Sequence, residues 1–177
     1  DPYDAKGLLT AAIRDPDPVI FCEPDRVYRA VRMEVPEESY VVPLGQAKVV
    51  REGSDLTLIS WGAHVRTAKQ AADRLAEEGL YDAEVVDVRT LSPFDIDTVA
   101  ASVIRTGHAV VVQEAPRTGG FASEIATQLM ERAILQLEAP VGRVTGLDTV
   151  PPLGKLEDYY HPDVERVIRQ IRATMEF

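Results

Sequence analysis

The 177-residue chain contains a single cysteine, Cys22. One thiol excludes an internal disulfide framework and a zinc cluster built from thiolates, and it fits a reducing compartment. The apolar neighbours of Cys22 predict a core position for it. No apolar run approaches the ~18 residues that a membrane-spanning helix requires, so we expect no membrane partner.

Basic residues are fewer than acidic residues. The 19 Lys and Arg against 29 Asp and Glu give a net charge of −10. This charge repels phosphate backbones, so we expect no nucleic-acid partner, and a basic protein suits it better. The chain has no initiator methionine and no signal-like segment, and we interpret Asp1-Pro2 as a processed or truncated start.

The middle of the chain alternates short β-branched runs with longer helical patterns. The runs are residues 56–60, 83–88, 109–112 and 141–144. Between them, apolar residues recur every three or four positions, and Gly79 and Gly107 end two of the helical segments. We place the start of the second helix at a capping box that spans residues 92–95. This alternation predicts an α/β fold, with a mostly parallel sheet covered by helices on both faces.

Further elements flank this pattern. Residues 47–52 predict an edge strand and residues 162–175 a closing helix. Near the start, Asp4 could cap a helix, and residues 19–22 predict a strand that follows it. A lone helix and strand cannot bury both their faces. We therefore predict three parts: the end of an upstream domain (1–23), an extended connector (24–46) and the α/β domain (47–177).

Two loops of the α/β domain are candidates for ligand binding. Residues 60–64 lie where a strand passes into a helix, the usual ligand position in open sheets, but they lack a full Gly-x-Gly-x-x-Gly fingerprint. Residues 117–120 precede a helix and could cradle an anion through free N–H groups. A tight loop where two backbones approach closely is the favoured interpretation of residues 117–120.

The three histidines show no metal-ligand spacing and no partner at a motif distance. We interpret His64, His108 and His161 as surface or capping residues. Asp15-Pro16-Asp17-Pro18 follows a helix end, whose last carbonyls could bind a monovalent cation, although a plain turn is favoured. Nothing in the sequence supplies a nucleophile with its base.

Several strings, in order over nearly the whole chain, carry a family resemblance. They are residues 17–21, 43–47, 51–57, 87–93, 113–116 with Gly119-Gly120-Phe121, 137–140 and 143–146. In this order they resemble the β subunits of the decarboxylating components of 2-oxo acid dehydrogenases. The likeness covers the end of the pyrimidine-binding domain and the whole C-terminal domain, which is similar to the last domain of transketolases.

The resemblance implies an α2β2 heterotetramer that uses thiamine diphosphate and magnesium. The partners would be the α subunit, a second β subunit and the subunit-binding domain of the dihydrolipoyl acyltransferase. The location would be the cytoplasm in a bacterium or the mitochondrial matrix in a eukaryote. The family's catalytic and thiamine-binding residues lie upstream of residue 1, so we assign none here and expect this portion alone to be inactive.

Two sites follow from the resemblance by matching positions. Main-chain oxygens of Ala12, Ile13, Asp15 and Asp17 would form half of a structural potassium site, where the family usually has Asn in place of Asp17. Glu138 and Ala139, from the string Leu137-Glu138-Ala139-Pro140, and the terminal carboxylate of Phe177 would bind the basic subunit-binding domain.

The substrate is less defined by the strings. Residues 23–29 and 115–121 resemble branched-chain enzymes more closely, whereas residues 113–115 and 132–135 also occur in pyruvate enzymes. Two alternatives remain: a stand-alone small-ligand-binding α/β domain, and a fragment of a transketolase-like enzyme.

Overall fold

Five strands form one sheet in the order β1-β3-β2-β4-β5 in the computed structural model, which describes residues 1–177. The strands are β1 (Lys48–Arg51), β2 (Leu56–Ser60), β3 (Ala83–Asp87), β4 (Ala109–Pro116) and β5 (Gly142–Gly146). β2 pairs in parallel with β3 and β4, and β4 with β5. β1 runs antiparallel to β3 at the edge. The predicted α/β fold with its added edge strand is therefore confirmed.

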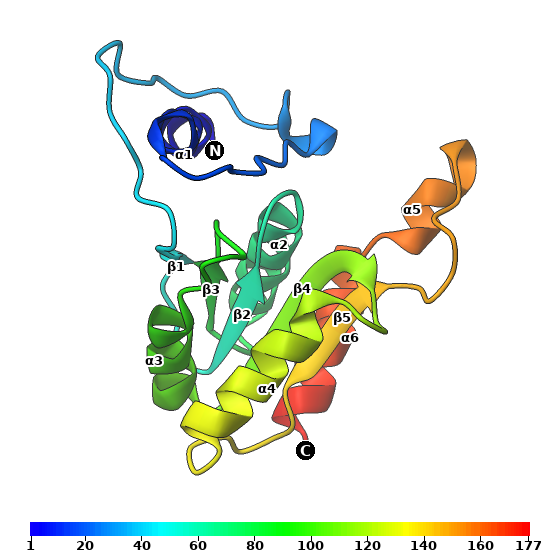
Figure 1. The fold of residues 1–177 in the computed structure, drawn as a ribbon. Coiled ribbons are helices and arrows are strands. Elements are labelled where there is room, and N and C mark those ends of the chain that lie inside the picture. The colour runs from blue at the N-terminus through cyan, green and yellow to red at the C-terminus, as the bar shows by residue number, and fades with distance from the viewer.

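Four helices cover the two faces of this sheet (Figure 1). They are α2 (His64–Glu77), α3 (Ile96–Thr106), α4 (Phe121–Ala133) and α6 (Val164–Met175). α2 and α6 lie on one face, and α3 and α4 on the other. Neighbouring residues of β2 pack on opposite faces of the sheet: Leu58 contacts the core under α2 and α6, and Ile59 the core under α3 and α4. This two-sided burial explains why the strands read as continuous apolar runs.

The start of α3 differs from the sequence prediction. The helix begins at Ile96 rather than within residues 92–95, because Asp95 is the N-cap. One oxygen of Asp95 accepts from the Thr98 N–H at 3.1 Å, and the other accepts from the Ala47 N–H at 2.9 Å. The same carboxylate thus caps α3 and fixes the entry to β1. Burial by itself raises the pKa of Asp95, but the hydrogen bonds from Ala47 and Thr98 outweigh it and hold the pKa below its ordinary value.

Replacing Asp95 with alanine is expected to lower the free energy of unfolding by about 1–2 kcal/mol at pH 7, because the cap is lost. The pKa of Asp95 is lower in the folded state than in the unfolded state, where it is near 3.9. The carboxylate therefore stabilises the fold at pH values above the unfolded-state pKa, and this stabilisation is lost as the pH falls through the folded-state pKa. Asp95→Asn keeps a cap but does not titrate. Urea unfolding should therefore show that the difference in the free energy of unfolding between the unmodified chain and Asp95→Asn shrinks from pH 6 to pH 3. A difference that grows over this range would contradict the prediction.

The first helix is capped differently from the prediction. α1 (Pro2–Arg14) has Asp1, not Asp4, as its N-cap, with the Asp4 N–H donating to the Asp1 carboxylate at 2.8 Å. The Asp4 side chain is buried and pairs with Arg89 at 2.6 Å and with Lys48 at 3.4 Å. The prediction missed this role because both partners lie far away in the sequence. Asp4 attaches α1 to the α/β domain.

The strand predicted at residues 19–22 is absent, and this prediction was wrong. The segment forms no strand and is followed by a short 3-10 helix, η1 (Asp25–Val27). Ile20 is 91% exposed, and Cys22 is exposed, so the predicted core position of Cys22 was also wrong. No strand of the sheet pairs with these residues, which leaves their apolar side chains without a surface to pack against. Ile13 of α1 is exposed as well, at 75%.

Figure 1 shows α1 and the connector set apart from the sheet, and a second projection formed by residues 147–161. The projection contains η2 (Gly154–Leu156) and α5 (Glu157–Tyr160), neither of which the sequence predicted. The division at residues 23 and 46 stays a prediction. None of the helices combines the length and the apolar character needed to cross a membrane.

Candidate functional site

The loop that joins β2 to α2 is filled by aromatic packing. Trp61 meets the ring of Phe121 edge-on with centroids 5.9 Å apart, and Phe121 meets Phe94 in the same way at 5.4 Å. Gly62 adopts a positive φ of 58°, which favours glycine. One glycine used for a turn and a tryptophan used for packing do not make a dinucleotide cradle. The geometry favours a structural role for Trp61 and Gly62.

The loop at residues 117–120 is closed by a glutamine that the sequence analysis missed. Gln113 is 1% exposed; its amide nitrogen donates to the Pro116 carbonyl at 2.8 Å, and its oxygen accepts from the Ala122 N–H at 2.7 Å. A Cβ on Gly120 would lie 2.0 Å from that amide nitrogen. The side chain thus caps α4 where an anion would otherwise bind. The tight-loop interpretation fits this geometry.

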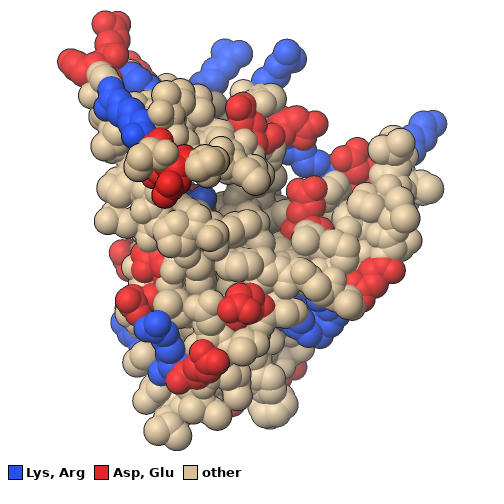
Figure 2. Space-filling view, in the orientation of Figure 1, with Lys and Arg blue, Asp and Glu red and all other residues tan.

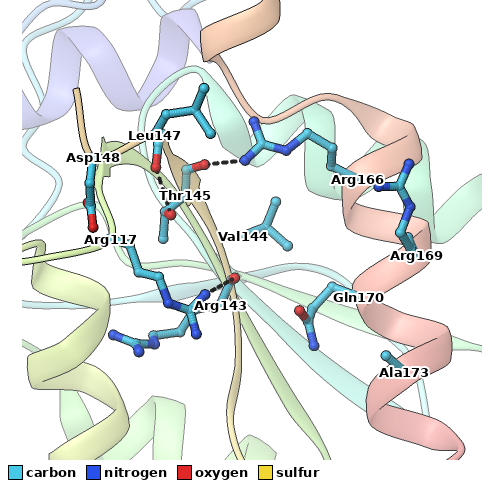
Figure 3. Close-up of a pocket in the computed structure, with 11 residues that line it drawn as sticks. Arg117, Arg143, Val144, Thr145, Leu147, Asp148, Arg166, Arg169, Gln170 and Ala173 are labelled. Atoms are coloured by element: carbon cyan, nitrogen blue, oxygen red, sulfur yellow. Dashed lines mark hydrogen bonds between the residues drawn. The ribbon is translucent and has the colours of Figure 1, made fainter. Parts of the chain in front are cut away.

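A pocket lies along β5 and includes Arg117 of this loop (Figure 3). Its volume is about 420 Å³. Four arginines line it, Arg117, Arg143, Arg166 and Arg169, with Asp148 as their acidic neighbour. Figure 3 shows the two α6 arginines on one side of β5 and Arg117 with Arg143 on the other. On a chain with a net charge of −10, this is a local positive surface that suits an anionic group.

Hydrogen bonds hold most of this lining in place. Arg143 donates to the Ser123 hydroxyl at 2.6 Å, and Arg166 donates to the Thr145 carbonyl at 2.5 Å. Hydrogen bonds from the N–H and hydroxyl of Thr118 hold the pKa of Asp148 below its ordinary value. The pocket was not predicted from the sequence, because its residues come from three separate elements. The spacing of Arg166 and Arg169, three apart on one helix, was the available signal.

Two of the three histidines lie together near a second, smaller hollow of about 200 Å³. His64 is the first residue of α2, and His161 follows α5; their rings are 5.9 Å apart, and both side chains are at least nine-tenths buried. His161 is the C-cap of α5, so the capping alternative holds for it. The surface alternative was wrong for both histidines. It failed because the carboxyl edge of the sheet joins positions that lie far apart in the sequence. His108 is half-buried, and its ring faces the Thr106 carbonyl at 3.3 Å.

An acidic side chain completes this histidine cluster. Glu114 of β4 has an oxygen 3.8 Å from Nε2 of His64. Burial, assisted by the nearby His161, Arg26 and Arg166, lowers the pKa of His64 to about 4. The His64 imidazole is therefore neutral at pH 7, with a free lone pair on one nitrogen.

The four positions matched to the potassium site lie at the end of α1. Ala12 is half-buried, and Ile13, Asp15 and Asp17 are exposed. The Ala12 carbonyl accepts from the Asp15 N–H at 3.4 Å, and the Asp17 N–H donates to the Asp15 carboxylate at 3.0 Å. The potassium half-site at these four positions stays a prediction.

The three positions matched to the docking site lie at the end of the domain where the parallel strands begin (Figure 1). Glu138 and Ala139 are in the loop between α4 and β5, where the Glu138 N–H donates to the Gly107 carbonyl at 2.9 Å. Ala139 is buried and fixes the loop, whereas Phe177 is 82% exposed. The neighbouring Leu135 is 90% exposed. A carboxylate and apolar side chains are thus available to a partner.

The chain is similar to known proteins over most of its length. Residues 45–167 match the family described as "Transketolase, C-terminal domain". Over 176 residues the chain is 50% identical to the pyruvate dehydrogenase E1 component subunit beta of Staphylococcus epidermidis (strain ATCC 35984) and 52% identical to that of Bacillus subtilis (strain 168). Each alignment covers 99% of this chain and 54% of the relative, so the chain spans about half the length of these curated relatives.

A solved structure agrees with the fold. A chain of a split gene transketolase, described as an inactive beta4 tetramer, superposes with a TM-score of 0.62 and 26% identity. The match covers 87% of this chain and 46% of that chain.

Proposed function

Because this chain belongs to the family of transketolase C-terminal domains, we propose that it is the C-terminal part of the β subunit of a 2-oxo acid dehydrogenase's decarboxylating component. The observation that carries the proposal is the identity of about half over nearly the whole chain to pyruvate dehydrogenase E1 β subunits. The complete enzyme would decarboxylate a 2-oxo acid and pass the acyl group to a lipoyl arm. This part would supply subunit interfaces and a docking surface.

Pyruvate is the substrate that the relatives' names support, ahead of the branched-chain acids towards which residues 23–29 lean. A transketolase-like fragment is the weaker alternative, because identity to the split transketolase is 26%, and because Glu138 and Phe177 are both present. We propose a cytoplasmic location in a bacterium, or the mitochondrial matrix in a eukaryote.

Exposed apolar side chains support a role in subunit contacts. On α1 and the segment after it, Ile13 and Ile20 are exposed, and on the projection of residues 147–161, Val150 and Leu153 are 83% and 93% exposed. Groups of this kind mark protein interfaces. Size exclusion after mixing with the α subunit should give a larger complex. A monomer under all conditions would instead favour a stand-alone ligand-binding domain that uses the pocket of Figure 3.

Thiamine diphosphate and magnesium belong to the proposed complete enzyme. Residues 117–122 do not form a diphosphate cradle, because Gln113 takes the Ala122 N–H. We therefore assign no cofactor contact and derive no catalytic step in this chain. For potassium, Ala12, Ile13, Asp15 and Asp17 would hold one side of the ion through their main-chain oxygens, a structural role outside the chemistry.

The docking surface is proposed to bind the basic subunit-binding domain of the acyltransferase through Glu138, Ala139 and the carboxylate of Phe177. Figure 2 shows acidic and basic side chains interspersed over one face of the molecule, with broad areas of other residues between them. The overall negative charge is therefore not gathered into one patch on that face. Local carboxylates beside exposed apolar groups are better suited to orient a basic partner than the net charge alone.

Glu138→Lys, or amidation of the C-terminal carboxylate, is expected to weaken binding of the subunit-binding domain about tenfold at low salt. The reason is that each change removes a carboxylate opposite Arg or Lys of the partner. The loss should shrink as salt rises, because the Debye length falls from about 10 Å at 0.1 M to about 3 Å at 1 M. Calorimetric titration at two salt concentrations measures both effects.

Glu34→Lys is the matched control, because Glu34 is exposed in the connector and the substitution alters the net charge equally. It should leave the affinity nearly unchanged. Equal losses for Glu34→Lys and Glu138→Lys would assign the effect to long-range charge and would rule out the docking site. Unchanged affinity for both docking variants would do the same, while leaving assembly with the α subunit as a separate test of the proposed function.

A further inference from the structure

Three side chains from separate elements direct ligand-type atoms at one point beside the hollow of about 200 Å³. They are His64 at the start of α2, Glu114 near the end of β4, and His161 between α5 and α6. One nitrogen or oxygen of each lies within 4.8 Å of the other two. In a tetrahedral zinc site with bonds of about 2.0–2.1 Å, neighbouring ligand atoms are roughly 3.3 Å apart. Small side-chain rotations therefore close the set around one ion.

The hydrogen bonding of the histidines leaves buried ring nitrogens free to bind a ligand. The His64 side chain is 5% exposed, yet neither of its ring nitrogens has a hydrogen-bond partner, and Nδ1 of His161 has none either. Buried polar groups are nearly always paired, so an orphaned imidazole needs an explanation. Imidazole nitrogens and carboxylate oxygens are ligands that zinc-class ions prefer.

The surrounding charges favour a cation on balance. Glu23, Asp25 and Glu157 also line the hollow, and Glu157 lies 3.4 Å from Nε2 of His161. Two arginines oppose a cation, and one of them, Arg26, lines the same hollow and pairs with Glu157 there. Arg26 pairs with Asp158 at 3.2 Å and with Glu157 at 3.6 Å, and Arg166 donates to the carbonyls of Thr145, Tyr160 and His161.

We propose that His64, His161 and Glu114 bind one divalent transition-metal ion of the zinc class, with Glu157 or water in the fourth position. The ion connects the start of α2, the end of β4 and the base of the projection of residues 147–161. It is a structural clip that orders this projection, and it is independent of the docking surface at the opposite end of the sheet.

The 177-residue chain, stripped with a chelator, should take up one Zn²⁺ per molecule in calorimetric titration and show a higher Tm with the metal. Co²⁺ as a probe should give the visible absorption of a low-coordinate histidine site. His64→Ala and His161→Ala should each weaken Zn²⁺ binding by more than about tenfold. Glu114→Gln should weaken it too, and because Glu114 is largely exposed, this variant keeps the fold if a histidine variant does not.

His108→Ala is the matched control, since His108 lies outside the cluster and should leave uptake unchanged. Absence of one-to-one uptake by the unmodified chain overturns the proposal. Uptake that survives both Glu114→Gln and a folded histidine variant, or that is lost equally in His108→Ala, places the metal elsewhere and overturns it as well.

Discussion

Replacing Glu84 with alanine is expected to lower the free energy of unfolding by about 3 kcal/mol. Glu84 of β3 is fully buried, and one of its oxygens accepts from the Ser102 hydroxyl at 2.5 Å while the other pairs with Arg105. Removing one partner of such a pair costs about 3–5 kcal/mol, because the remaining polar groups lose their partners. Arg105 is 53% exposed, so water screens part of the interaction and the lower figure applies.

The expected loss extends beyond one ion pair. The Ser102 hydroxyl also meets the Thr57 hydroxyl at 2.6 Å, and Thr57 meets Thr106 at 2.8 Å. These groups join β2 to α3 inside the layer, where unpaired polar atoms are costly. Alanine at residue 84 removes the acceptor that anchors this chain of hydrogen bonds to β3.

Urea unfolding measures the effect through the midpoint at a constant m value. Glu84→Gln keeps an acceptor for Ser102 and should lose less than Glu84→Ala. Glu77→Ala is the surface control, because Glu77 is exposed at the end of α2, and it should change stability by under about 0.5 kcal/mol. A loss for Glu84→Ala as small as that of Glu77→Ala would show that the buried carboxylate does not hold the layer together.

The sheet could be predicted from the sequence because its signals are local. The apolar spacing of residues 64–77 and the β-branched runs place each element, and Gly107 ends α3 in the left-handed conformation as expected. The segment of residues 19–22 shows the limit of such signals. Its composition is typical of a strand, but a strand exists only when another strand pairs with it, and here none does.

The sites were harder to predict because they depend on contacts between distant positions. His64 and His161 come together at the carboxyl edge of the sheet, which no spacing rule reveals. Gln113 is an ordinary strand residue in the sequence, and its capping role follows from the return of the chain towards β4 after residue 120. Polar residues near strand ends were the available signal, since ligand sites in open sheets lie there.

Gly120→Ala is expected to lower the free energy of unfolding by about 2–6 kcal/mol. The new Cβ would lie 2.0 Å from Nε2 of Gln113 and 2.4 Å from the Pro116 carbonyl oxygen. Gln113 cannot move aside freely, because it caps α4 and is almost fully buried. Overpacking costs about 1–3 kcal/mol, and the displaced buried amide adds about 1–3 kcal/mol.

Gly119→Ala is the matched control for this close approach. Gly119 has φ +73° and open space around its Cβ position, whereas Gly120 has an ordinary φ of −77° and no space. Alanine at residue 119 should therefore cost only the left-handed backbone strain, about 1–2 kcal/mol. Urea unfolding of both variants separates the effect of steric contact from that of backbone conformation. A larger loss of stability for Gly119→Ala would show that backbone conformation, not steric contact, is the main reason for glycine at these two positions.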